Sequence, residues 1–401
     1  MKRIMTLALA ALCVAAGHAA TSGDHRRALL DSILHHNTTL AALRQQVVSG
    51  KAANRTDLRL PDPDVDFAYL WGTPDGTPPR KDFGVSQQLD WGTLTGRRSR
   101  LARSADERLE RDYDVQALAI MAEADRAIVS LTYCNRLCAE LRRRSELAQE
   151  IQTLYDAKFE RGDIDRMSLN KVRLNRSMAA AELQRAEAER LDALATLKEL
   201  NGGIEMTYPD TLYATPPLPA LSNLLAAVRE SSPAVTAARA AINERREQVK
   251  LNRTLALPAL TVGYTGEYIK GQNYSGVSVG LSLPLWGNGR SKVKQSRASL
   301  TEAELDLTDA TTRLTAEVER RYATALRLQQ TADQLRRDLD ATDNAPFLRR
   351  ALDAGRLSLP EYLLELSFYY EARTLWLEAE RDAQLARADL LNMLPHNGIS
   401  N

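Results

Sequence analysis

Few side chains in this sequence are suited to catalysis or metal binding, and their spacing favours structural roles. Cys134 and Cys138 lie four residues apart in a stretch with helical periodicity, so both thiols share one face with Leu137 and Leu141. A disulfide or a soft-metal site is the alternative, but helix geometry strains a bridge between such close neighbours, and no histidine lies nearby in sequence. We therefore expect both thiols to be packed in a core.

The histidines also give little support for a metal site. His25, His35, His36 and His396 lie near the ends of the chain. His35 and His36 could contact a metal ion, but adjacent residues point apart on a helix. We expect a solvated surface there and predict no metal site.

Motifs for phosphate binding or nucleophilic catalysis are not found. Gly96, Gly287 and Gly289 fall in expected turns and belong to no phosphate-cradling pattern. The 53 basic and 52 acidic residues nearly cancel, so no basic excess indicates nucleic acid. We predict a protein that is not an enzyme, holds no cofactor and binds no nucleic acid.

The N-terminus has the pattern of a secretory signal peptide over residues 1–19. Lys2 and Arg3 precede an apolar run, and small residues stand at the two positions that a signal peptidase reads. The apolar run is too short to cross a bilayer as a helix. We expect an exported chain.

The sequence is internally duplicated. The segment 84–89 recurs as 276–281 at an offset of 192, and the segment 159–164 recurs as 352–357 at an offset of 193. A register kept over about 75 residues indicates a repeated unit. We predict a first repeat over 20–215 and a second over 216–401.

Each repeat is expected to contain a long helical hairpin. A helix from Arg97 to about Glu160 would be about 96 Å long at 1.5 Å per residue, and the second repeat is expected to contain its counterpart from Arg290 to about Asp353. Each rod leads to a glycine turn and a shorter return helix, which gives hairpins over 97–200 and 290–394. Helices over about 37–55 and 233–253 would stack end to end with the return helices, and the rods would pack side by side as coiled coils.

Four segments between the helices alternate apolar and polar residues with a period of two. They are the expected strands, at about 64–72, 82–91, 259–269 and 274–285. Such alternation over about ten residues is typical of a membrane β-barrel, although a soluble sheet with one buried face gives the same pattern. Four strands cannot close a barrel, and an open edge in lipid is costly. The membrane interpretation therefore requires several copies of the chain.

At this point the sequence resembles the TolC family of outer-membrane efflux proteins, the outer-membrane factors of tripartite efflux pumps. The likeness covers nearly the whole chain after residue 19. It is most specific in the strand exit 276–286, which ends in Pro-Leu-Trp, and in the turns 162–164 and 355–357. The first strand exit, 88–92, departs from the family pattern because it lacks the proline.

The resemblance implies a mainly α protein with a small transmembrane β part. It implies a homotrimer in which four strands from each copy form a 12-stranded β-barrel in the cell outer membrane, continued as an α-helical barrel across the periplasm. The expected function is that of a passive channel-tunnel. Its expected partners are outer-membrane lipid, a periplasmic adaptor (membrane fusion protein) and an inner-membrane efflux pump.

The resemblance also points to functional residues at the inner end of the tunnel. By position, the adaptor-docking residues are Gly162, Ile164, Gly355 and Leu357. The periplasmic gate candidates are Asp163, Asp165 and Asp353. The alternatives are a hairpin turn that needs glycine for its dihedral angle and ordinary helix capping by Asp165.

Two other classes of protein stay open as alternatives. A periplasmic adaptor has a long α-hairpin, but typically one hairpin with β-domains of its own. A coiled-coil structural protein of the envelope would explain the rods but not the strands. The cargo, whether drug, metal cation or polypeptide, is not encoded in a readable motif, although the compact chain favours a pump of the resistance-nodulation-division kind.

Overall fold

The computed structural model describes residues 22–74, 76–213, 217–283, 288–342 and 344–394. The signal peptide and the Pro-Leu-Trp strand exit lie outside these residues. The helices are α1 (Ser22–His36), α2 (Thr38–Ala53), α3 (Trp91–Leu94), α4 (Arg97–Glu160), α5 (Arg166–Leu200), α6 (Leu221–Ser231), α7 (Pro233–Leu255), α8 (Asn288–Ala341), α9 (Ala345–Asp353) and α10 (Leu359–Leu391). A single 3₁₀ turn, Thr56–Leu58, follows α2.

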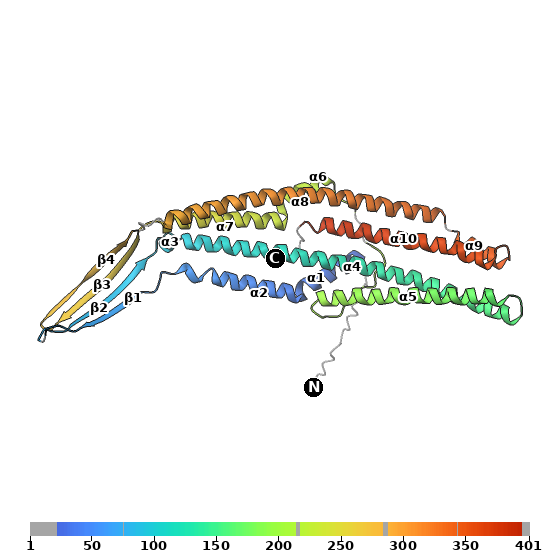
Figure 1. The fold of residues 1–401 in the computed structure, drawn as a ribbon. Coiled ribbons are helices and arrows are strands. Elements are labelled where there is room, and N and C mark those ends of the chain that lie inside the picture. The colour runs from blue at the N-terminus through green and yellow to red at the C-terminus, as the bar shows by residue number, and fades with distance from the viewer. Residues whose placement is uncertain (1–21, 75, 214–216, 284–287, 343, 395–401) are drawn as a thin grey trace, which may run out of the picture.

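The helices form an elongated layer of four columns (Figure 1). α8 forms one edge column, α7 and α10 share the next, α4 forms the third, and α2 and α5 share the other edge column. α4 contacts α5 and α2 on one side and α7 and α10 on the other. The predicted end-to-end stacking of short helices beside long rods is therefore confirmed.

The first rod is continuous because nothing in its sequence interrupts it. α4 runs for 64 residues without glycine or proline, which corresponds to about 96 Å. It is preceded by Gly96, whose φ of 66° is left-handed, and is followed by Gly162, whose φ is 78°. Glycine adopts this conformation without the strain that a Cβ would add.

The prediction of an equally continuous rod from Arg290 to Asp353 was wrong. α8 ends at Ala341 and a separate helix, α9, begins at Ala345 with Pro346 in its first turn. Proline lacks the N–H that a helix interior requires, and its ring clashes with the carbonyl four residues earlier. Pro346 is therefore tolerated only at a helix start.

Four antiparallel strands form one sheet in the order β1-β2-β3-β4. They are β1 (Asp64–Leu70), β2 (Arg80–Leu89), β3 (Ala259–Ile269) and β4 (Gln272–Ser282). The β2–β3 pairing joins the two repeats, with Val85 opposite Tyr264. The sheet projects from one end of the helical layer (Figure 1).

Three predicted strand ends were wrong by a few residues, and the fourth strand ends at Ser282 rather than at about residue 285. The first strand stops at Leu70, and the second stops at Leu89 rather than at Trp91. Trp91 instead begins α3, because the carboxylate of Asp90 accepts hydrogen bonds from Gly92 N and Thr93 N and caps that helix. The indole Nε1 of Trp91 donates to Pro258 O at 2.7 Å, which fixes the junction between sheet and helices.

Packing between the columns supplies the hydrophobic core. One cluster at the far end from the sheet combines both repeats, with Ile151, Val172 and Tyr362 at its centre. Cys134 and Cys138 are free thiols buried in another cluster, beside Trp376, so the prediction of packed thiols is confirmed. Burial raises the pKa of Cys134 to about 11.

Within the described residues, no helix combines the length and the apolar character needed to cross a bilayer.

Candidate channel wall and tunnel tips

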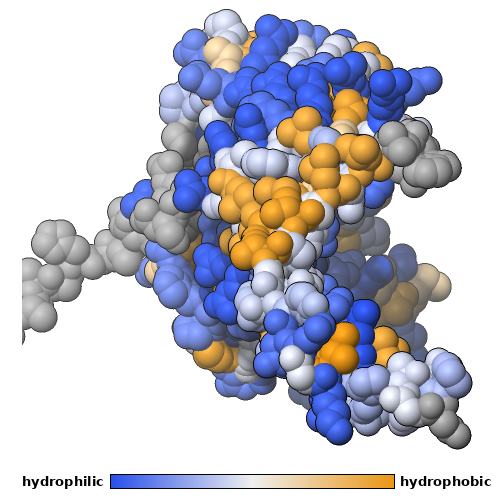
Figure 2. All heavy atoms as spheres, turned by 90° about the vertical axis from the view of Figure 1, so that its left-hand side faces the viewer, coloured by the Kyte–Doolittle hydropathy of each residue, from blue (hydrophilic) through white to orange (hydrophobic). Residues whose placement is uncertain are grey.

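The sheet presents two chemically different faces. One face carries rows such as Val65, Val85, Tyr264 and Val277, which lie opposite one another across the four strands. The apolar side chains are strongly exposed, with 69% of Phe67 and 76% of Val277 accessible. In the view from the strand end, hydrophobic residues gather in a band bordered by hydrophilic surface (Figure 2). Exposure of this extent requires a covering partner.

The opposite face of the sheet is lined by small and polar residues. A representative row is Asp66, Gly84, Thr265 and Gly276. Such a face can be wetted, and its glycines leave room above the backbone. The two faces together fit a wall with water on one side and an apolar medium on the other.

Charged groups concentrate on the polar face near the end of the sheet that lies away from the helices. Asp82 lies opposite Glu267 across the β2–β3 pair. Arg80 bridges them, with its Nη2 at 2.7 Å from Asp82 Oδ2 and at 3.2 Å from Glu267 Oε1. The side chains at this end of the wall are therefore polar, and their negative charge is partly neutralised by Arg80.

The two predicted tips lie together at the end of the molecule that is opposite the sheet (Figure 1). Gly162 and Gly355 have φ values of 78° and 67°, and a Cβ on either would meet no atom within 4 Å. An equivalent hydrogen bond closes each turn: Asp163 N donates to Lys158 O, and Arg356 N donates to Ala351 O, each at 2.9 Å. The two hairpins thus end in equivalent C-terminal turns.

The aliphatic side chains that follow the glycines are less exposed than the sequence suggested. Ile164 and Leu357 are half-buried and pack against the cluster that contains Tyr362 and Leu359. Each therefore presents only part of its side chain to a partner. The glycines themselves are exposed, so the backbone of both turns is open to contact.

The three acidic gate candidates are exposed and have local partners. Asp163 pairs with Arg161 at 3.1 Å, and Asp353 pairs with Arg349 at 3.2 Å. The carboxylate of Asp165 accepts from Ser168 N at 2.8 Å and caps α5.

Capping also affects the ionisation of Asp165. Hydrogen bonds from the Ser168 side chain and backbone hold its pKa below the usual value. The helix-capping interpretation of Asp165 is therefore confirmed, and a gate role would have to coexist with it.

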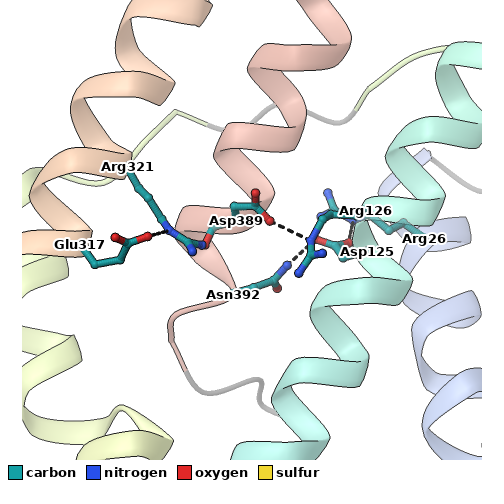
Figure 3. Close-up of polar contacts among 7 residues, drawn as sticks. All are labelled: Arg26, Asp125, Arg126, Glu317, Arg321, Asp389 and Asn392. Carbon is teal, nitrogen blue, oxygen red and sulfur yellow. Dashed lines mark hydrogen bonds and ion pairs between the residues drawn. The ribbon is translucent and has the colours of Figure 1, made fainter. Parts of the chain in front are cut away.

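A polar network that the sequence gave no hint of lies midway along the layer (Figure 3). Asp125 on α4 is buried and accepts from Arg26 Nε at 2.7 Å and from Arg26 Nη2 at 2.5 Å. Asn392, at the end of α10, donates to the same carboxylate at 3.2 Å. These partners are separated by 99 and 267 residues in sequence, so no local pattern could reveal them.

The same region links α8 to the network. Arg126 pairs with Asp389 at 2.9 Å, and Arg321 donates to Asp389 O at 2.8 Å. Arg321 is itself paired with Glu317 on α8. The network therefore connects α1, α4, α10 and α8, and so holds three columns and the N-terminal helix together.

A second buried charge cluster lies nearer the tips. Glu140 on α4 pairs with Arg144 at 3.1 Å and with Arg373 on α10 at 2.8 Å. Arg136 pairs with Glu380 one turn away, and burial raises the pKa of Glu380. These ion pairs join the two repeats.

The three histidines that the structure describes have ordinary structural partners, and His396 lies outside the described residues. His35 Nδ1 lies 2.7 Å from Asp31 O, and His36 Nδ1 lies 3.0 Å from Ser32 O, each within its own helix. His25 Nδ1 lies 2.9 Å from Asp210 Oδ1. In the part of the chain that the structure describes, no group of three or more His, Cys, Asp or Glu residues could hold a metal ion.

Comparison with known proteins agrees with this geometry. Residues 224–395 match the sequence model of the family described as outer membrane efflux protein. No curated protein sequence is a significant match. The matched segment contains β3, β4 and the second helical hairpin.

Solved structures extend the likeness to most of the chain. The CmeC outer membrane channel of Campylobacter jejuni is similar with a TM-score of 0.71 and 16% identity, over 92% of this chain and 85% of that one. The open-state MtrE outer membrane channel of Neisseria gonorrhoeae gives 0.71 and 18%, over 92% and 89%. The outer membrane protein VceC of Vibrio cholerae gives 0.71 and 15%, over 92% and 96%.

The predicted fold, a mainly helical protein with a small four-stranded part, is confirmed by these likenesses and by the observed elements. Both repeats contain two short helices, two strands, a long helix and a return helix in the same order, while the 3₁₀ turn and α3 occur only in the first and the separate helix α9 only in the second. Residues 224–395 are therefore similar to the outer membrane efflux protein family, and the chain as a whole shares the fold of the solved outer-membrane channels.

Proposed function

We propose that three copies of this chain form the outer-membrane channel-tunnel of a tripartite efflux system. The assembly would be a passive conduit that crosses the cell outer membrane and extends through the periplasm. An inner-membrane pump would deliver the cargo, and a periplasmic adaptor would join pump and channel.

The observation that carries this proposal is the two-faced sheet with free edges. β1 and β4 each pair on one side only, and unpaired backbone groups in lipid are costly. Joining β4 of one copy to β1 of the next satisfies these groups and puts the exposed apolar face toward lipid. Three copies would give twelve strands, enough to leave a lumen.

The helical layer supports the same assembly. Its edge columns are α8, which contacts α7, α10 and α6, and α2 with α5, which contact α4 on their inner side. Leu174 on α5 and Leu305 on α8 are 63% and 65% exposed. In a ring of three copies, one edge column would pack against the other edge column of the next copy.

Adaptor docking belongs at the tips, at Gly162, Ile164, Gly355 and Leu357. Both turns expose backbone at a glycine, which permits close approach of another chain. Asp163, Asp165 and Asp353 lie beside them, and three copies would repeat each carboxylate as a ring that raises the local cation concentration.

Purification and conductance measurements test the proposal. The exported chain should need detergent for solubility, show the mass of a trimer by light scattering, and conduct ions in planar lipid bilayers. A soluble monomer without conductance would instead support an adaptor or a coiled-coil structural protein of the envelope.

A further inference from the structure

Both long helices begin with a run of basic residues at the end that lies next to the sheet (Figure 1). Residues 95–105, at the start of α4, contain four arginines and no acidic residue. Residues 288–301, at the start of α8, contain two arginines, two lysines and no acidic residue. Because the whole chain has 53 basic and 52 acidic residues, the positive charge at this level of the molecule is a local concentration.

These basic residues oppose the electrostatics of the helices that carry them. The N-terminal end of a helix bears a partial positive charge, so cations are unfavourable there and acidic residues are favourable. Neither α4 nor α8 has an acidic residue in its first turn. At the opposite end of the molecule, by contrast, Asp165 caps α5 and Glu361 completes a capping box on α10. Helix stability therefore does not explain the basic runs.

Most of these side chains are exposed and have no acidic partner within the chain. Arg98 is an exception, because its Nε lies 2.6 Å from Asp90 Oδ2. Six others, which we call the basic collar, are exposed and form no ion pair with the described residues. They are Arg100 and Arg103 on α4, and Arg290, Lys292, Lys294 and Arg297 on α8. The collar therefore presents uncompensated positive charge to its surroundings.

The collar follows the apolar face of the sheet along the length of the molecule (Figure 1). The last row of that face is Leu89, Leu260 and Leu281, and Leu281 is 60% exposed. From Arg290 to Arg297, α8 advances by about 10 Å, and the headgroup region of one leaflet is about 5–8 Å deep. With the apolar face in hydrocarbon, the collar would lie at the level of the adjoining headgroups.

We propose that the basic collar binds the phosphate groups of anionic phospholipids, such as phosphatidylglycerol, in the leaflet of the outer membrane that faces the periplasm. Each phosphate accepts hydrogen bonds from Arg or Lys and supplies the negative charge that the starts of α4 and α8 lack. Three copies would repeat the collar around the barrel. The inference rests on the proposed function, because the collar meets headgroups only if the sheet lies in the membrane.

Thermal unfolding of the trimer in dodecyl maltoside micelles tests the binding. Added dioleoyl phosphatidylglycerol should raise the melting temperature with saturation, because a ligand that binds the folded state stabilises it. Dioleoyl phosphatidylcholine has the same chains without net charge, and glycerol 3-phosphate has the phosphate without chains, so neither should do so at the same concentration. An equal shift with either compound, or no shift with phosphatidylglycerol, would overturn the proposal.

Variants locate the site on α8. Arg290→Gln with Lys292→Gln should weaken the apparent affinity for phosphatidylglycerol at least about tenfold, because each cation near an anionic surface contributes separately. Arg327→Gln with Arg337→Gln is the matched control: both arginines are exposed on the same helix and form no ion pair with the described residues, but they lie far from the sheet. Its affinity should not change. Equal weakening in both variants would show that the collar is not the site.

Stability without phosphatidylglycerol separates lipid binding from a structural role. The Arg290→Gln, Lys292→Gln variant should then melt no lower than the parent, because it removes cations from the positive end of α8. A lower melting temperature would instead assign these side chains to the fold and overturn the proposal. Conductance of the same samples in phosphatidylcholine bilayers reports separately on the channel. A conducting trimer without a phosphatidylglycerol response would remove the collar proposal alone.

Discussion

Gly162 and Gly355 hold equivalent places in the two hairpins, and their left-handed dihedral angles explain the residue type without any partner. Both glycines are also exposed, with open space where a Cβ would lie. The dihedral angle does not account for this exposure, whereas docking of another chain does. The two roles can be compared with a bulky substitution and with asparagine, which tolerates the left-handed conformation.

Gly355→Trp should impair efflux while leaving the amount of protein in the outer membrane unchanged, because a large side chain would block approach of the adaptor. Gly355→Asn is the control, since asparagine tolerates the left-handed region and adds little bulk. Drug-susceptibility assays with membrane immunoblots measure both. Equal impairment by both variants would indicate loss of the turn rather than loss of docking.

Asp165 combines a helix cap with a candidate gate charge. Asp165→Asn should keep the hydrogen bond to Ser168 N, because asparagine is as good an N-cap as aspartate, but it removes the charge. If the carboxylates form a gate ring, cation selectivity in bilayers should fall while the melting temperature changes little. Unchanged reversal potentials would leave Asp165 with the capping role alone.

The pH dependence of this cap has a defined sign. The pKa of Asp165 is lowered from 3.8 in the folded chain by its hydrogen bonds to Ser168. The capping contribution is therefore fully present above about pH 3.8 and is lost as the pH falls through the lower folded value. Asp165→Asn should abolish this component of acid sensitivity, measured as unfolding against pH.

At the scale of elements, the strands and rods were predictable to different degrees. The period of two located all four strands, because alternate residues of a strand face opposite sides. Their ends were less certain: Trp91 continues the alternation, but Asp90 caps a helix and removes it from the strand. Pro346 has no effect on the apolar periodicity around it, yet it ends the second rod.

The two faces of the sheet can be tested with neighbouring substitutions. Val277→Arg would place a charge on the apolar face and should destabilise the membrane-inserted protein by about 2–4 kcal/mol. Ser278→Arg is the matched control on the polar face. Heat-modifiable gel mobility and urea titration in lipid vesicles measure the difference. If both substitutions are equally tolerated, the apolar face does not contact lipid.

At the scale of the whole molecule, the two repeats are joined by buried charges as well as by the β2–β3 pairing. Asp125 is only 2% exposed at its side chain, and it binds Arg26 from α1 and Asn392 from α10. Losing one member of a buried ion pair leaves the other without compensation. The network therefore couples the N-terminal helix to both halves.

Asp125→Ala should destabilise the fold by about 1–3 kcal/mol, because the Arg26 guanidinium, whose side chain is 31% exposed, loses its charged partner. The surface variant Glu189→Ala, whose pair with Arg185 is exposed, should cost less than about 1 kcal/mol. Chemical denaturation followed by circular dichroism compares them. A small effect of Asp125→Ala would mean that the network does not hold the columns together.

The sequence by itself determined the duplicated plan, the long helices, the alternating strands and the glycine turns. Each of these depends on residues within a few positions of one another, where helical and strand periodicities act. Only the tertiary structure decided which columns are neighbours and that Asp125 meets Arg26 and Asn392. Those features join residues far apart in the chain, and their positions are fixed by packing that no local pattern encodes.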